Sequence, residues 1–209
     1  WENQLVDGLW TYSIESIWSG LQDCYADLRS NVKKLYDGIE IESLAAIGVS
    51  AMMHGYMPFN EKEEILVPFR TWRNTNTGRA AAELSELFVY NIPLRWSISH
   101  LYQAILNNET HVKDIKFLTT LAGYVHWQIT GEKVLGIGDA SGMLPIDPAT
   151  NNYSAEMVEK FDNLIAPKEY NWKLENILPK VLSAGENAGV LTPEGSRKLD
   201  VSGHLKAGI

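Results

Sequence analysis

Hydrophobic residues recur three and four positions apart along most of the chain, and this spacing predicts amphipathic helices. The first predicted helix begins at Ile14, directly after Ser13, a residue suited to cap it. Its apolar face comprises Ile14, Ile17, Trp18, Leu21, Tyr25 and Leu28. Further helices are predicted over residues 80–88, 101–106 and 117–129 and after an N-cap at Ser154. Helices therefore outnumber strands in the predicted fold.

One stretch breaks the helical spacing. Residues 44–49 are apolar without interruption, and a run this short predicts a strand that is buried on both faces. Two more strands are predicted over 56–59 and 65–69, joined by a charged turn, and Pro68 restricts the second to a sheet edge or a strand end. Helices combined with a buried strand predict an α/β fold.

Glycine, proline and asparagine gather in residues 136–142 and 145–152, which are predicted loops. The glycines of the first loop are one residue too far apart for a Gly-x-Gly-x-x-Gly dinucleotide site, and that loop follows a predicted helix rather than a strand. No repeat or long linker divides the 209 residues. The chain is therefore expected to form one α/β unit.

The charge of the chain limits its partners. Its 18 basic and 26 acidic residues give a net charge of −8, which repels nucleic acid and anionic membranes. No apolar stretch approaches the length of a transmembrane helix. The single cysteine, Cys24, falls on the apolar face of the first predicted helix, where it is expected to be a core residue, and it permits no internal disulfide. This cysteine usage fits a reducing cytoplasm.

The most informative polar residue is His54. It follows the 44–49 run and precedes Gly55, and the carboxyl ends of strands are where open α/β sheets bind ligands. An imidazole at such a strand end can equally satisfy local backbone groups, so both roles stay open. The other histidines show no metal-ligand spacing and are expected to be core or surface residues: His100, His111, His126 and His204.

A second candidate site lies in residues 71–77, where Trp72 precedes Asn74 and Asn76 among threonines. An aromatic face stacks on the apolar face of a sugar, and amide groups bind its hydroxyls, so this composition suits a small polyol. An Asn or Thr of the same segment could instead cap the following helix. The two roles are compatible.

These segments resemble the FGGY family of carbohydrate kinases, and most of all its xylulokinase-type members. Residues 47–55 resemble the family's strand with its Gln-Met-His-Gly segment, and 69–77 are similar to its Trp-Asn-Asp-Gln-Arg-Thr element. Residues 129–142 look like its Leu-Thr-Gly-Glu and Ser-Asp-Ala-Ser-Gly pair, and 178–192 resemble the segment before its nucleotide site. The four resemblances are in order and span nearly the whole chain.

The resemblance implies a ribonuclease H-like, actin/hexokinase-type ATPase fold, with residues 1–209 as a helix-rich, incomplete N-terminal sugar-binding lobe. It implies ATP-dependent phosphorylation of a ketose or polyol with Mg²⁺, so that sugar and ATP are the expected partners. It also implies that the sugar is bound by Met53, His54, Trp72, Asn74 and Asn76. Asp139 is a weaker candidate that could instead cap its loop.

The chain departs from the family pattern at three positions. Met52 stands where Gln is usual, Asn74 replaces the usual Asp, and Asn76 replaces the usual Arg. The last two changes remove one charge of each sign. They leave the identity of the sugar undetermined, and they favour an alternative function, that of a sugar-binding or regulatory homologue without catalysis.

Two family segments are expected outside these 209 residues. The Asp-x-Gly-Thr turn that approaches the nucleotide phosphates would precede Trp1, and the Gly-Gly-Asp segment with the catalytic base would follow Ile209. Because phosphoryl transfer needs both positioning and a base, the chain alone is predicted to be inactive. Strand 44–49 is expected to lie at a sheet edge or to pair with a second copy, as in a homodimer.

Overall fold

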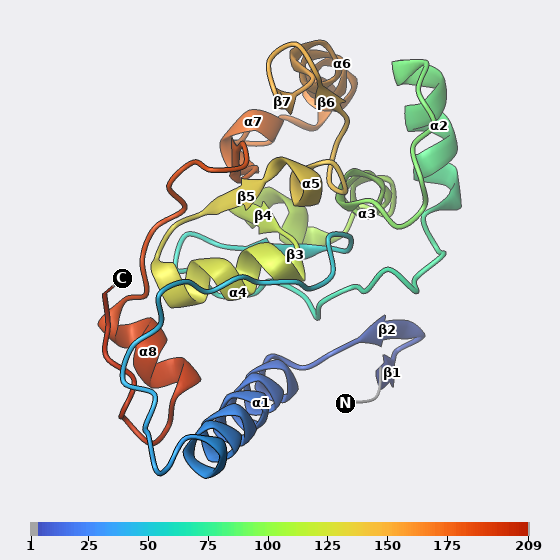
Figure 1. The fold of residues 1–209 in the computed structure, drawn as a ribbon. Helices are drawn as coiled ribbons and strands as arrows, with labels where there is room; N and C mark the ends of the chain where they lie inside the picture. Colours follow the sequence, from blue (N-terminus) through green and yellow to red (C-terminus); the bar gives the residue numbers. More distant parts are fainter. Residues whose placement is uncertain (1–3, 209) are drawn as a thin grey trace.

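The computed structural model describes residues 4–208, and Figure 1 shows their arrangement. The helices are α1 (Ile14–Leu35), α2 (Gly78–Phe88), α3 (Ser97–Leu106), α4 (Leu121–Thr130), α5 (Ile137–Ala140), α6 (Ala155–Ile165), α7 (Leu174–Ile177) and α8 (Pro193–Leu199), with 3₁₀ turns at Thr110–Asp114 and Ala166–Lys168. The antiparallel strand pairs are β1 (Gln4–Val6) with β2 (Leu9–Thr11), β3 (Met57–Phe59) with β4 (Phe117–Thr119), and β6 (Ile146–Asp147) with β7 (Asn152–Tyr153). One pair is parallel, β5 (Val134–Gly136) with β8 (Lys180–Leu182). The fold is α/β and helix-rich, as predicted.

The β3–β4 pair separates two hydrophobic cores. Side chains of a strand alternate between its faces, and here Tyr56 and Leu118 enter the first core while Met57, Phe59 and Phe117 enter the second. The first core lies under α2, α3 and α6, and the second under α1, α4 and α8. A three-residue strand can thus be buried completely because both of its faces are covered.

Aromatic rings organise the second core. Phe59 stacks on Tyr124 at a centroid distance of 5.7 Å and meets the edge of Trp127 at 5.2 Å. The indole N–H of Trp18 donates to the hydroxyl of Tyr124 at 3.1 Å, which joins α1 to α4. Strand β3, helix α4 and helix α1 are therefore held in one packing unit.

Several predicted helices are confirmed. Helix α1 begins at Ile14, and the hydroxyl of Ser13 accepts from the N–H of Ser16 at 3.0 Å. Helix α6 follows Ser154, whose hydroxyl accepts from the N–H of Met157. Helices α2 and α3 cover the predicted ranges 80–88 and 101–106.

The helix predicted over 117–129 is wrong in its first four residues. Residues 117–119 form β4, and the hydroxyl of Thr120 then caps α4 by accepting from the N–H of Gly123 at 3.2 Å. Phe117 and Leu118 face different cores, which requires the alternation of a strand.

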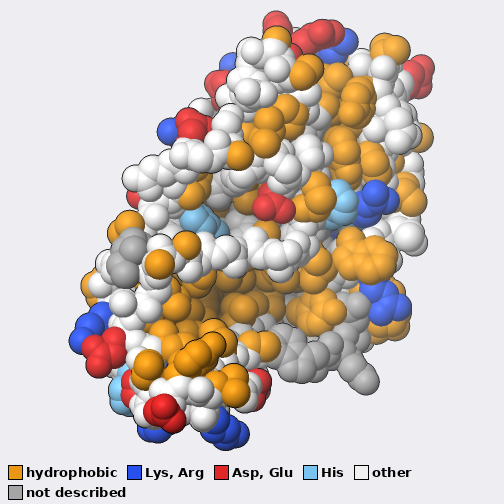
Figure 2. All heavy atoms as spheres, in the orientation of Figure 1, with side chains coloured by type: hydrophobic (Ala, Val, Ile, Leu, Met, Phe, Trp, Pro, Cys, Tyr) orange, Lys and Arg blue, Asp and Glu red, His pale blue; other side chains and the backbone are white. Residues whose placement is uncertain are grey.

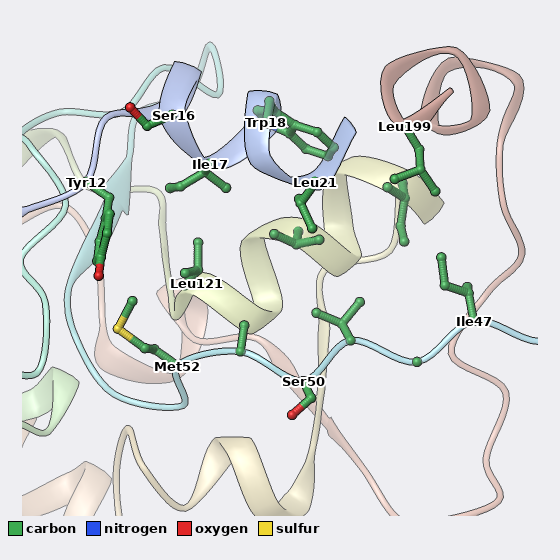
Figure 3. A pocket seen from close by; sticks show the side chains of 15 residues that line it. Tyr12, Ser16, Ile17, Trp18, Leu21, Ile47, Ser50, Met52, Leu121 and Leu199 are labelled. Carbon is green, nitrogen blue, oxygen red and sulfur yellow. The ribbon is translucent and has the colours of Figure 1, made fainter. Parts of the chain in front are cut away.

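The prediction of a buried strand over 44–49 is also wrong. This segment is extended but forms no ladder with any residue that the structure describes, and most of it is exposed. Residues 47–52 instead lie along an apolar cavity of about 400 Å³ that they share with α1 and α4. Figure 3 shows Ile17 and Leu21 of α1 pointing into this cavity toward Leu121. Hydrophobic side chains gather in the same hollow in Figure 2.

Other corrections concern single positions and short segments. Cys24 is exposed, because it lies at the edge of the apolar face of α1, whereas its neighbour Tyr25 is buried. Of the strand predicted over 65–69, only an isolated bridge of Ile65 with Phe59 forms, on the edge of β3 that β4 leaves free. The predicted loops 136–142 and 145–152 contain α5 and the β6–β7 pair.

No helix between residues 4 and 208 has the length and apolar character required to span a bilayer.

The close packing of α8 on α4 gives a stability prediction. Thr192 donates its N–H to the carbonyl of Ile129 at 3.0 Å, and a Cβ on Gly195 would clash with that same carbonyl. Gly195→Ala should therefore lower the free energy of unfolding by about 1–3 kcal/mol. The matched control is Gly78→Ala at the start of α2, where nothing lies within 4 Å of the added Cβ. In urea denaturation, this change should leave the free energy of unfolding unchanged or raise it slightly. Equal effects would contradict the packing described.

Candidate functional site

The two segments singled out in the sequence meet beside β3. Tyr56 and Arg70 form an antiparallel bridge in which the N–H of each donates to the carbonyl of the other, at 3.0 and 3.2 Å. The bridge is isolated, because Gly55 has a φ of 118° and residues 72 and 73 form a turn, so no ladder extends to His54 and Trp72. The structure therefore joins the two candidate segments at the Tyr56–Arg70 bridge.

The backbone just before β3 requires a glycine. Gly55 has a φ of 118°, and a Cβ there would lie 2.6 Å from the carbonyl oxygen of Arg70. Its own carbonyl accepts from the hydroxyl of Ser97 at 2.6 Å in a buried hydrogen bond. The first residue of α3 thus fixes the chain directly after His54.

His54 itself is half-buried. Its Nδ1 lies 3.4 Å from the carbonyl oxygen of Gly142, in the loop that follows α5. Burial lowers the pKa of the His54 imidazole, the hydrogen bond to Gly142 partly opposes this, and the positive charge of Arg95 lowers it further. The imidazole is therefore neutral at pH 7.

A buried polar cluster lies behind this segment. The guanidinium of Arg70 pairs with the carboxylate of Glu109 and lies 5.2 Å from the centroid of the Tyr56 ring. The Tyr56 hydroxyl and Nε2 of His111 are 2.8 Å apart. These contacts hold both residues of the Tyr56–Arg70 bridge in place, and so they fix the point where the two candidate segments join.

The side chains of the 71–77 segment have different environments. Trp72 is 52% exposed and Asn76 is exposed, so both are open to a ligand. Asn74 is buried, and its amide accepts from the N–H of Trp10 at 2.9 Å and donates to the carbonyl oxygens of Trp10 and Thr71 at 2.8 and 3.0 Å. Asn74 therefore ties the segment to β2.

The alternative role of this segment, capping the following helix, is met in position but not in hydrogen bonding. Thr77 occupies the N-cap position of α2, but its side chain makes no capping hydrogen bond. Its hydroxyl instead donates to the carbonyl of Leu94 at 2.5 Å. This bond brings the residues before α3, Arg95 among them, toward the 71–77 segment.

Asp139 is a residue of α5. It lines a cavity of about 330 Å³ at the carboxyl ends of the parallel strands β5 and β8, together with His126 and Glu186. Burial raises the pKa of the Asp139 carboxyl. Because β5 ends at Gly136, the 136–142 segment follows a strand and not a helix, contrary to the sequence prediction.

Three contributors to the site were not found in the sequence. Ser97 and Arg95 approach from the start of α3, and Gly142 approaches from the far end of α5. They are 41 or more positions from His54 along the chain, so no local spacing signals them. Within residues 4–208, no group of three or more His, Cys, Asp or Glu side chains is arranged to hold a metal ion.

Comparison with known proteins specifies the family of this α/β chain. The sequence pattern of the FGGY family of carbohydrate kinases, N-terminal domain, matches residues 6–203. The chain belongs to this family.

Its relatives include xylulose kinases. Xylulose kinase of Haemophilus influenzae is 25% identical over 159 residues, which cover 71% of this chain and 31% of that protein. The crystal structure of a xyloylose kinase from Brucella ovis superposes with a TM-score of 0.75 at 19% identity, covering 94% of this chain and 39% of the other. Gluconate kinase from Lactobacillus acidophilus gives a TM-score of 0.71 at 16% identity, covering 94% and 38%. The chain thus spans less than two fifths of these relatives and has the fold of the matching part, the predicted actin/hexokinase-type lobe.

The environment of Asn74 gives a second prediction. Asn74→Asp would remove two donated hydrogen bonds and place a carboxylate oxygen against the carbonyls of Trp10 and Thr71. The free energy of unfolding should fall by about 1–3 kcal/mol. The same change at the exposed Asn76, Asn76→Asp, should alter it by less than about 0.5 kcal/mol in the same urea titration. An Asn74→Asp variant as stable as the control would show that these bonds do not hold the segment.

Proposed function

We propose that the complete protein transfers the γ-phosphoryl group of ATP to a hydroxyl of a ketose or polyol, and that residues 1–209 form part of its N-terminal lobe and bind the sugar. The observation that supports the proposal is the joining, at the Tyr56–Arg70 bridge before β3, of the segment with a neutral His54 and the segment with an exposed Trp72, in a chain that matches the FGGY family over 6–203. The protein acts in the cytoplasm, and the exposed 44–49 segment is where a homodimer would pair.

Each proposed site residue has a chemical task. The indole of Trp72 supplies an apolar face for the carbon skeleton of the sugar. The imidazole of His54 and the amide of Asn76 bind hydroxyls, and the half-buried Met53 limits the space beside them. Asn74 contributes by fixing the segment that carries Trp72 and Asn76, since its polar atoms are already bonded to Trp10 and Thr71.

ATP and Mg²⁺ complete the proposed reaction. ATP supplies the phosphoryl group, and Mg²⁺ neutralises the charge that develops on it. The residues of this chain bind and orient the sugar that accepts the group. We assign none of them to the metal or to the base that takes the hydroxyl proton.

The alternative is a sugar-binding or regulatory homologue without catalysis. The substitutions at 74 and 76 favour it because they remove charges that are usual in the family. The bonding of Asn74 weakens that argument, because the neutral side chain has a structural role that a carboxylate could not fill.

A coupled assay separates the two functions. The complete protein should phosphorylate at least one member of a panel containing xylulose, glycerol and gluconate when ATP and Mg²⁺ are present. The 209-residue chain alone should give no turnover above background with any of them. Absence of turnover by the complete protein, combined with saturable sugar binding, would support the alternative.

The role of His54 gives a third prediction. In the complete protein, His54→Ala should lower kcat/KM for the accepted sugar about 5- to 150-fold, because a hydroxyl loses a hydrogen-bond partner and the loss is about 1–3 kcal/mol. The matched control is His204→Ala, at an exposed histidine that lies beside Arg29 and Ser202. The control should keep the original kcat/KM. If both variants do so, His54 only satisfies local backbone groups.

A further inference from the structure

The backbone of Gly142 passes unusually close to the segment that carries His54. A Cβ built on Gly142 would lie 2.6 Å from Nδ1 and 3.0 Å from Cε1 of His54, and it would also clash with the carbonyl oxygen of Met53. Every other residue type carries that Cβ. Only glycine therefore permits this approach.

Neither side of this contact can easily move away, because α3 begins between them and bonds to both. The hydroxyl of Ser97 donates to the carbonyl of Gly55, directly after His54. The N–H of Ile98 donates to the carbonyl of Met143, directly after Gly142, at 3.1 Å. Consecutive residues of α3 thus hold the two segments against each other.

The loop is also fixed from its own side. Met143 and Leu144 are fully buried in the first core. The N–H of Gly142 donates to the carbonyl of Asp139 at 3.0 Å, and that of Met143 to the carbonyl of Ala140 at 2.9 Å. A side chain at position 142 would therefore displace His54 rather than the loop.

The contact also determines where the imidazole carries its proton. The carbonyl oxygen of Gly142 can only accept, so Nδ1 of His54 must be the nitrogen that bears hydrogen. In a neutral imidazole, the other nitrogen then has a free lone pair. No residue between 4 and 208 is hydrogen-bonded to Nε2 of His54, so this lone pair is available to a ligand.

We propose that Gly142 is a positioning residue which holds His54 as the Nδ1–H tautomer, so that Nε2 accepts a hydrogen bond from a hydroxyl of the substrate. The identity of that ligand as a sugar rests on the proposed function, whereas the tautomer and its dependence on Gly142 do not. The site is thereby matched to a ligand that donates a hydrogen bond at this point.

The tautomer can be measured without a ligand. In the ¹⁵N-labelled 209-residue chain, with the His54 signals assigned from a His54→Gln variant, the imidazole shifts at pH 7 should show hydrogen on Nδ1. This measurement needs no variant at the contact itself and so does not depend on how Gly142→Ala folds. Hydrogen on Nε2 instead would overturn the proposal.

The dependence on position 142 is tested by two alanine variants of the same segment. Gly142→Ala should abolish the Nδ1–H pattern and raise the pKa of His54 toward its ordinary value, because the ring is pushed out of its buried position. Gly138→Ala, where nothing lies within 4 Å of the added Cβ, should leave the His54 signals unchanged. Unchanged His54 signals in both variants would overturn the proposal.

A double-mutant cycle in the complete protein tests whether Gly142 acts through His54. Gly142→Ala should lower kcat/KM for the accepted sugar at least tenfold, and adding it to His54→Ala should cause little further loss. Independent, multiplicative losses would overturn the positioning role. Failure of the wild-type protein to phosphorylate any sugar would contradict the proposed function instead, and the tautomer result would still stand.

Discussion

The structure depends on the burial of strand β3 between two cores. Tyr56, Met57 and Phe59 are almost completely inaccessible, and their alternation sends one ring to the first core and the other two side chains to the second. Moving the strand by one residue would exchange the two sets of side chains. The register is therefore strongly specified, and His54, two residues before Tyr56, is placed by the same constraint.

Polar contacts transmit this constraint to the candidate site. The bridge between Tyr56 and Arg70 is held by the pairing of Arg70 with Glu109 and of Tyr56 with His111. A buried guanidinium is tolerated only with such partners. The 71–77 segment leaves this bridge directly and is tied down again by Asn74 at Trp10, so the exposed Trp72 lies between two anchored points.

Local features of the sequence were sufficient to predict some elements of this structure. Ser13 and Ser154 marked helix starts correctly, because a cap and its helix are neighbours in the chain. The sequence also singled out His54 and the 71–77 segment, although their roles toward a sugar remain predictions. The strand predicted over 44–49 was wrong because an apolar run forms a strand only where another segment pairs with it. No described residue forms such a ladder with this segment. Gly142 was missed because its requirement for glycine arises from contact with a residue 88 positions away.

We propose that the sugar binds beside His54, just before β3, and against Trp72. A crystal structure of the complete protein with a sugar that it phosphorylates would test this proposal. We expect a sugar hydroxyl within hydrogen-bonding distance of Nε2 of His54 and the carbon skeleton of the sugar against the indole of Trp72. A sugar that contacts neither residue, for instance one bound in the apolar cavity between α1 and α4, would show that the site lies elsewhere.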